Sequence, residues 1–170
     1  MSGWESLRPA DAAELLGELD APWWIAGGWA LDALAPREHG DLDVMVLRRD
    51  LPRVASALRG WELDEKANCV WARPAGSASW HLELVLDDAD GDTWRYRRDA
   101  RVTRPLASLG AVGGPLAPEV VLLYKAKDDG ETARRDFAAV VPLLSDRARA
   151  WLRDAVALAH PDSVHVAVLS

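Results

Sequence analysis

The sequence has a single cysteine, no long apolar run and no surplus of positive charge. Because Cys69 is alone among 170 residues, neither a disulfide framework nor a zinc site of the Cys/His type can be built from it. No window approaches the roughly eighteen apolar residues that a membrane-spanning helix needs, and the first residues have neither the basic start nor the apolar core of a signal peptide. We therefore expect a cytoplasmic protein that makes no contact with a membrane.

The charge balance narrows the range of partners. A net charge of −7 has the wrong sign for a general nucleic-acid binder, because binding to phosphates draws on a surplus of Lys and Arg. An acidic surface is compatible with a cationic small substrate, although many proteins are acidic for solubility alone, and that is the default explanation. The length of 170 residues and the hydrophobic content of 49% predict one domain, with or without a helical appendage.

Residues 23–47 contain the most informative pattern. An apolar run ends at Gly27 and Gly28, a short helical segment follows over residues 29–34, and a second apolar strand begins at Asp41. Glycines between a strand and a helix let the backbone approach a phosphate, and the start of the helix supplies free N–H groups. A glycine pair of this kind is weak evidence by itself.

The second strand of this stretch begins with two acidic residues. Because side chains alternate along a strand, Asp41 and Asp43 are expected to point the same way, with Leu42 and Val44 on the other face. Carboxylates about 6–7 Å apart destabilise each other unless a cation lies between them. Hard oxygen ligands suit magnesium, which commonly shares its coordination shell with substrate phosphates. The glycine pair and the acidic pair, in this order, reinforce each other.

A third acidic residue occurs on a later strand, predicted over residues 80–86. Alternation places His81, Glu83 and Val85 on one face. A Glu flanked by leucines is ordinarily a solvent-facing residue, and a third carboxylate of the acidic site is the alternative. The acidic stretch 87–92 is interpreted as a solvated hairpin turn, because it lacks the twelve-position calcium-loop pattern with its final Glu.

These motifs resemble the DNA polymerase beta-type nucleotidyltransferase superfamily, and the strings GGWALDAL and REHGDLDV resemble the small bacterial proteins similar to aminoglycoside and lincosamide nucleotidyltransferases. The similarity extends over residues 23–144, through LELVLDDADGDTW, APEVVLLYKAKD and RRDFAAVVPLL. It implies an α/β (α+β) fold: a small mixed nucleotidyltransferase-type sheet with flanking helices. Residues 1–115 would form the catalytic core, and residues 116–170 a C-terminal helical region packed on it.

The resemblance also implies a set of site residues. Asp41, Asp43 and Glu83 would be the catalytic residues and the ligands of magnesium, two ions being expected, with Glu83 also a candidate base. The nucleotide-binding residues would be Gly27, Gly28, Arg37, His39 and Lys127.

One lysine near the triphosphate is part of the implied site. Lys125 and Lys127 lie two residues apart and cannot share one helix face. Lys127 is preferred for this role, and a pair of solvated lysines is the alternative. Asp136 is expected to brace a lysine or an arginine, as in similar proteins, and not to touch substrate.

The implied reaction is transfer of a nucleoside monophosphate, AMP from ATP, to a hydroxyl of a small acceptor such as an aminoglycoside or a related antibiotic. One departure matters, because residues 35–40 are a few residues shorter than the family's turn before the Asp pair. This keeps open a catalytically degenerate nucleotide- or ligand-binding protein, and also the nucleotidyltransferase partner of a toxin–antitoxin pair. The acceptor, the nucleobase and the choice between monomer and homodimer stay open.

The remaining elements are read from periodicity and caps. The alternation of Trp94 and Tyr96 with arginines predicts an exposed or edge strand. Trp80 and Trp94 could line the acceptor pocket, and packing in the core is the default explanation for both. The tail 163–170 is read as an edge strand, an oligomer contact or a frayed end. Helices are predicted over 6–19, 51–58, 118–127, 132–144 and 146–159. Asp50 is a candidate cap of the helix over 51–58, and Ser145 of the helix over 146–159. Further strands are predicted over 61–65, 68–73 and 102–104.

Overall fold

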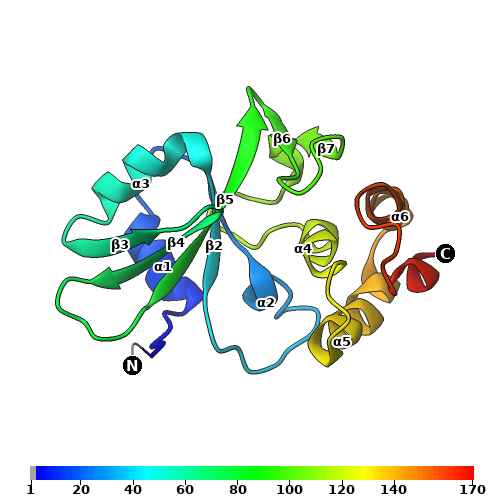
Figure 1. The fold of residues 1–170 in the computed structure, drawn as a ribbon, viewed down its shortest axis with the longest axis horizontal. Helices are drawn as coiled ribbons and strands as arrows, with labels where there is room; N and C mark the ends of the chain where they lie inside the picture. Colours follow the sequence, from blue (N-terminus) through cyan, green and yellow to red (C-terminus); the bar gives the residue numbers. More distant parts are fainter. Residues whose placement is uncertain (1–2) are drawn as a thin grey trace.

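The structure, a computed structural model, describes residues 3–170 and contains a seven-stranded mixed sheet (Figure 1). Its central strands lie in the order β1-β2-β5-β4-β3, and β6 and β7 extend from the far end of β5. Neighbours pair antiparallel except β2 and β5, which are parallel. The strands are β1 (Trp23–Ile25), β2 (Asp43–Leu47), β3 (Trp61–Glu65), β4 (Cys69–Pro74), β5 (Leu82–Asp90), β6 (Thr93–Arg95) and β7 (Thr103–Pro105).

The register of the central strands decides which side chains are neighbours. Asp43 of β2 pairs with Glu83 of β5, and Glu83 pairs in turn with Trp71 of β4. Residues that are directly opposite each other share a face of the sheet. The two carboxylates and the indole therefore stand in one row across three strands.

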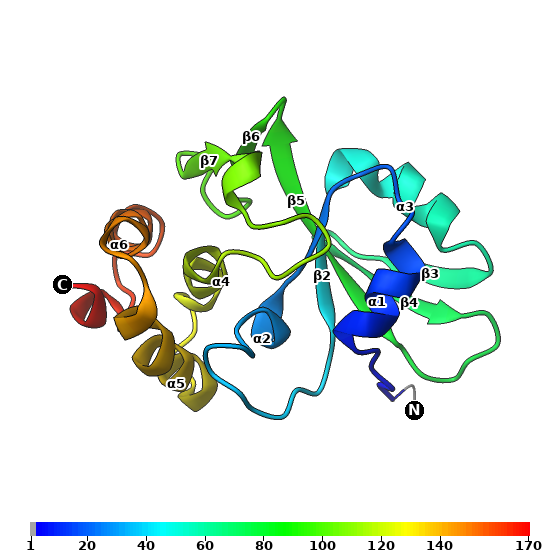
Figure 2. The ribbon, with the colours of Figure 1, turned by 180° about the vertical axis from the view of Figure 1, so that it is seen from behind.

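One face of the sheet is covered by two helices, α1 (Pro9–Leu16) and α3 (Leu51–Ala57); in Figure 2, α1 lies in front of the sheet and α3 runs above β3. Apolar side chains of the strands meet those of the helices there, because the strands alternate between faces. The buried residues of this first core are Ala12, Leu16, Trp23, Ile25, Leu42, Val44, Val46, Val54, Leu58, Val70, Ala72, Leu82, Leu84 and Leu86.

The second core lies on the other side of β2, where α2 (Gly27–Ala30), α4 (Pro118–Lys125), α5 (Glu131–Val140) and α6 (Asp146–Ala159) gather (Figure 1). Trp24 and Met45 bring the sheet into this core. The amphipathic pattern of the C-terminal residues explains the packing of these helices. Val120, Phe137 and Leu152 are fully buried in this core, whereas Leu158 on the outer side of α6 is 41% exposed. None of the helices in residues 3–170 is long and apolar enough to cross a membrane.

Most predicted elements are present, and some of their details differ. The strand over 61–65 and the helix over 146–159 have the predicted bounds, and Ser145 caps that helix by accepting a hydrogen bond from the backbone N–H of Ala148 at 3.2 Å. Asp50 makes no capping hydrogen bond and instead forms an ion pair with Arg53 at 3.2 Å.

The structure decides between the alternatives left open for two segments: the exposed strand at Trp94 and Tyr96 was wrong, and the default of core packing for Trp94 is confirmed. Trp94 and Tyr96 are fully buried, because the two rings enter the second core while Arg95 between them is exposed. The C-terminal tail is not an edge strand: it ends in a 3-10 turn, Val166–Leu169, and Leu169 is buried. His165 stacks on Phe137 with ring centroids 4.0 Å apart, which fixes the tail against α5.

Candidate active site

Three carboxylates converge at the edge of β2. Asp41, Asp43 and Glu83 each offer one oxygen, and these oxygens lie within 4.8 Å of one another. Asp43 begins β2 and Glu83 lies beside it on β5, whereas Asp41 precedes the strand and is exposed. Backbone pairing therefore sets the separation of Asp43 and Glu83, and Asp41 approaches from the preceding loop.

The electrostatics of this group match a cation site. Burial, followed by repulsion from Asp41 and Glu83, raises the pKa of Asp43 to about 7, and Lys125 and Arg97 act weakly in the opposite direction. Three hard oxygen donors that repel each other are a donor set that suits magnesium. These three residues could hold a divalent ion, and its charge would relieve the repulsion.

Gly27 and Gly28 lie against the acidic group for a steric reason. Gly27 has φ +57°, and a Cβ atom there would collide with the carboxylate of Asp43. A Cβ atom on Gly28 would lie 2.5 Å from Nη2 of Arg37 and 2.6 Å from Nδ1 of His39. A side chain at either position would therefore displace these groups, and at Gly27 the positive φ adds backbone strain.

Arg37 and His39 hold the short 35–40 loop against α2. Nε2 of His39 lies 2.8 Å from Oδ1 of Asp32, and its ring packs on Trp29 with centroids 4.5 Å apart. Nε of Arg37 lies 3.6 Å from Oδ1 of Asp136 on α5. The structure thus places both residues beside Gly28, with their polar atoms engaged by acidic neighbours.

The lysine nearest the carboxylates is Lys125, whereas Lys127 was preferred from the sequence. Lys125 lines the same cavity as Asp43, and its Nζ lies 2.9 Å from Oδ2 of Asp136. Lys127 follows the end of α4, is exposed and lines a different hollow beside His160. The helix ends at Lys125, so two further residues turn the chain away from the site. Asp136 braces both a lysine and an arginine, as expected.

The cavity at the site has a volume of about 260 Å³. Its walls combine the acidic group, the glycine turn, a lysine and two arginines. The lining residues that bear on chemistry are Gly27, Asp41, Asp43, Glu83, Arg97, Arg98, Tyr124 and Lys125. Anionic and cationic groups therefore face one space, as a triphosphate with its metal would require.

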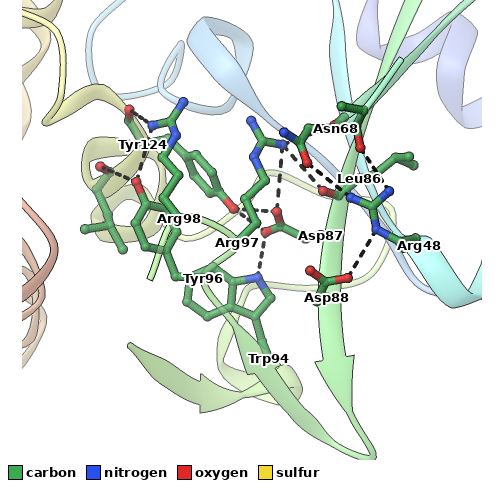
Figure 3. Close-up of polar contacts among 12 residues, drawn as sticks. Arg48, Asn68, Leu86, Asp87, Asp88, Trp94, Tyr96, Arg97, Arg98 and Tyr124 are labelled. Carbon is green, nitrogen blue, oxygen red and sulfur yellow. Dashed lines mark hydrogen bonds and ion pairs between the residues drawn. The ribbon is translucent and has the colours of Figure 1, made fainter. Parts of the chain in front are cut away.

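A buried acid that was missed from the sequence, Asp87, supports one wall of this cavity (Figure 3). It accepts hydrogen bonds from Nε1 of Trp94 at 2.7 Å and from the hydroxyl of Tyr124 at 2.5 Å, and Nη1 of Arg97 lies 3.9 Å away. Burial raises the pKa of Asp87, and the hydrogen bonds oppose that effect. The guanidinium of Arg97 lies 5.1 Å from the ring centroid of Tyr124.

The prediction of a solvated turn at 87–92 was therefore wrong for Asp87. Strand β5 continues to Asp90, and the reversal occurs at Gly91, which has φ +57°. The signal that could have found Asp87 is its position: it directly follows Leu86 on an apolar strand and is followed by a tryptophan and a tyrosine that carry polar hydrogens.

Comparison with known proteins agrees with this geometry. The family model described as aminoglycoside-2''-adenylyltransferase matches residues 10–81, which include both glycines and both aspartates of the site. Over these residues the chain resembles the aminoglycoside nucleotidyltransferases. No curated protein matches it in sequence.

Two solved structures have a fold similar to that of this chain. The solution structure of the antibiotic-resistance factor ANT(2'')-Ia has a TM-score of 0.59 at 17% identity, over 85% of this chain and 87% of that one. The crystal structure of ANT(2")-Ia in complex with adenylyl-2"-tobramycin has a TM-score of 0.59 at 18% identity, over 85% of this chain and 92% of that one. These likenesses confirm the predicted fold class, a mixed α/β sheet with flanking helices.

Proposed function

We propose that this protein is a nucleotidyltransferase that transfers AMP from ATP to a hydroxyl of an aminoglycoside-type acceptor, with two magnesium ions held by Asp41, Asp43 and Glu83. The observation that carries the proposal is the convergence of these three carboxylates beside the Gly27 turn and Lys125, around one cavity. The description of the matching family and the tobramycin adduct of the similar structure support this donor and this acceptor class.

Each side chain has a task in this reaction. Magnesium supplies charge neutralisation of the triphosphate and lowers the pKa of the acceptor hydroxyl. The backbone at Gly27 and Gly28 accommodates the phosphates, because no Cβ atom occupies that space. Lys125, and not Lys127, offsets the charge of the departing pyrophosphate. Glu83 accepts the proton of the attacking hydroxyl.

The acidic character of the protein fits a cationic acceptor. The net charge is −7, and a negative surface attracts a polycation by long-range electrostatics. This attraction falls with ionic strength. We expect KM for a cationic acceptor to rise with added salt more steeply than KM for a neutral one.

The test is a screen for pyrophosphate release with each nucleoside triphosphate, magnesium and tobramycin as the acceptor. We expect release with ATP, none after chelation of the metal, and a loss of roughly 10²–10³-fold or more in kcat for Asp41→Asn. The matched control is Asp92→Asn, which changes an exposed acid on the turn between β5 and β6 and should keep full activity.

Two outcomes would contradict the proposal. Nucleotide binding measured by calorimetry, without pyrophosphate release under any condition, would favour the catalytically degenerate binding protein. Transfer that survives Asp41→Asn unchanged would remove the proposed mechanism while leaving the enzyme class in place.

A further inference from the structure

The guanidinium of Arg97 lines the candidate active-site cavity and is only partly engaged by the protein. Arg97 follows the buried Tyr96 in the turn after β6, and its side chain is 17% exposed. Its Nη1 donates to the backbone carbonyls of Asn68 at 3.3 Å and Leu86 at 3.4 Å. In residues 3–170, its Nε and Nη2 make no hydrogen bond. An enclosed cation with unused donors in a cavity wall indicates a place for an anionic ligand.

Asp87 lies close to this guanidinium without contacting it directly. It is the only acid within 4 Å of the guanidinium in the described part of the chain, and Oδ1 of Asp87 is 3.9 Å from Nη1 of Arg97. This separation exceeds the length of a hydrogen bond. The oxygens of Asp87 accept instead from two neutral groups, Nε1 of Trp94 at 2.7 Å and the hydroxyl of Tyr124 at 2.5 Å. Arg97 therefore keeps two of its donor nitrogens for another partner.

The ring of Tyr124 connects Asp87 to the arginines of the cavity. Its hydroxyl lies 2.5 Å from both oxygens of Asp87. The guanidiniums of Arg97 and Arg98 lie 5.1 and 5.2 Å from its ring centroid, and the ring lies between the two side chains in the view of Figure 3. Cation–π attraction holds a guanidinium against a ring at these distances. Because the buried carboxylate fixes the tyrosine, it also limits the directions in which Arg97 can extend.

The charges in the cavity restrict what these arginines bind. Three cationic side chains line it, and one of them, Lys125, is paired with Asp136 at 2.9 Å. Arg98 is exposed and donates to a hydroxyl and to a backbone carbonyl, so the enclosed cation without a carboxylate at hydrogen-bond distance is Arg97. A guanidinium in this state beside a metal site matches a multiply charged anion. Phosphate groups meet this requirement, whereas a nucleobase carries no charge.

We propose that Arg97 binds a phosphate of the nucleoside triphosphate and that Asp87 is a positioning residue, which acts through Tyr124 and does not touch the substrate. Nε and Nη2 lie on one edge of a guanidinium and form a fork that matches two oxygens of a phosphate. In residues 3–170, these are the two nitrogens of Arg97 that have no partner. The inference rests on the proposed function, because the triphosphate is its donor, and it adds an arginine and a buried acid to the residues that handle that donor.

The direct test is calorimetry of inorganic tripolyphosphate binding to the protein in the presence of magnesium and without an acceptor. We expect Arg97→Gln to weaken binding about tenfold or more, the loss for one hydrogen bond to a charged group. Arg97→Lys keeps the charge without the fork, and its affinity should lie between the two. The matched control is Arg95→Gln, which removes the same charge from an exposed residue of β6 that pairs with Asp90. It should leave the affinity within about twofold.

Comparison with ATP identifies the part of the nucleotide that Arg97 contacts. Arg97→Gln should weaken the binding of ATP and of tripolyphosphate by the same factor, and KM for tobramycin should not change. A loss for ATP alone would place the arginine against the nucleoside and overturn the proposal. Absence of tripolyphosphate binding to the wild type, or equal affinity in the wild type and folded Arg97→Gln, would overturn it too.

The positioning role of Asp87 needs a readout that a purely structural role would not give. We expect Asp87→Asn and Tyr124→Phe to weaken tripolyphosphate binding about threefold or more in the wild type, and to cause no further loss in Arg97→Gln. Losses of equal size in both backgrounds would show that Asp87 acts independently of Arg97, which contradicts the positioning role. Tyr124→Phe keeps the aromatic ring, so it provides the same test if Asp87→Asn does not fold.

The binding measurements separate this inference from the proposed function, because they contain no acceptor. A protein that binds tripolyphosphate through Arg97 but releases no pyrophosphate with tobramycin would fail as an aminoglycoside adenylyltransferase and still support the phosphate contact. Release of pyrophosphate, together with unchanged tripolyphosphate binding in Arg97→Gln, would leave the function in place and remove the contact.

Discussion

The ammonium of Lys125 lies 2.9 Å from Oδ2 of Asp136, and this carboxylate is almost fully buried. Its other oxygen lies 3.6 Å from Nε of Arg37. One acid on α5 therefore holds both the lysine at the end of α4 and the loop that covers Gly28. The positions of Lys125 and Arg37 therefore depend on Asp136, which does not itself line the cavity.

The two lysines near the end of α4 should differ sharply in their effect on activity. We expect Lys125→Ala to lower kcat/KM for ATP by roughly 10²-fold or more, because the departing pyrophosphate loses its cationic neighbour. Lys127→Ala, a change of the same charge at an exposed position, should leave kcat/KM within about twofold. Equal losses in the two variants would contradict the assignment of Lys125.

Replacement of Asp136 should affect both stability and nucleotide binding. Asp136→Asn removes one partner of a buried ion pair, which costs about 3 kcal/mol of the free energy of unfolding. Because Lys125 and Arg37 are then less restrained, KM for ATP should rise while KM for the acceptor stays the same. Urea unfolding and kinetics at saturating acceptor measure the two effects. A rise in KM for the acceptor alone would show that Asp136 acts elsewhere.

The raised pKa of Asp43 predicts a stability that depends on pH in metal-free protein. The group titrates at 3.8 in its ordinary state and at about 7 in the fold, so its contribution to stability is present below pH 3.8 and lost as the pH rises to 7. One pKa unit corresponds to about 1.4 kcal/mol, which sets an upper bound of about 4 kcal/mol on this loss. Asp43→Asn should therefore raise Tm at pH 8 in the presence of a chelator.

The comparison at lower pH provides the control for this prediction. The gain in Tm of Asp43→Asn over the wild type should shrink as the pH falls from 8 to 5, since Asp43 itself becomes protonated there. A gain that is constant over this range, or a loss at pH 8, would be inconsistent with a repelled carboxylate.

Gly27→Ala should weaken both the fold and the site. A side chain at φ +57° costs about 1–2 kcal/mol, and the added methyl group also meets the carboxylate of Asp43. We expect a lower Tm together with a large drop in kcat. Gly40→Ala is the matched control, because nothing lies within 4 Å of the position where its Cβ would be built. Comparable activity of Gly27→Ala and Gly40→Ala would refute the steric argument.

Two members of the acidic group, Asp43 and Glu83, could be predicted from the sequence because their signals are local and periodic. Alternation along two apolar strands identifies Asp43 and Glu83 as side chains of one face, and the resemblance supplies the pairing of those strands. The same alternation does not apply to Asp41, which precedes β2 and reaches the group from a loop. Its place in the site follows from the fold and could not be derived from strand geometry.

The errors have a common physical origin in long-range packing. Trp94 and Tyr96 alternate with arginines, a pattern typical of an exposed strand, but the C-terminal helices cover their rings. Burial of Asp87 depends equally on Tyr124, which is distant in sequence and donates a hydrogen bond to it. The choice between Lys125 and Lys127 depends on where α4 ends, and helix ends are the least predictable part of a helix.

The parallel pairing of Asp43 with Glu83 has a consequence for how this molecule can change. A shift of one position in that pairing would send a carboxylate into the apolar layer under α1 and α3, so the reactive geometry is tied to correct assembly of the sheet. The β3–β4 hairpin, in contrast, is joined to this row along one side only. Changes on its outer strand, β3, therefore leave the pairing of Asp43 with Glu83 in place.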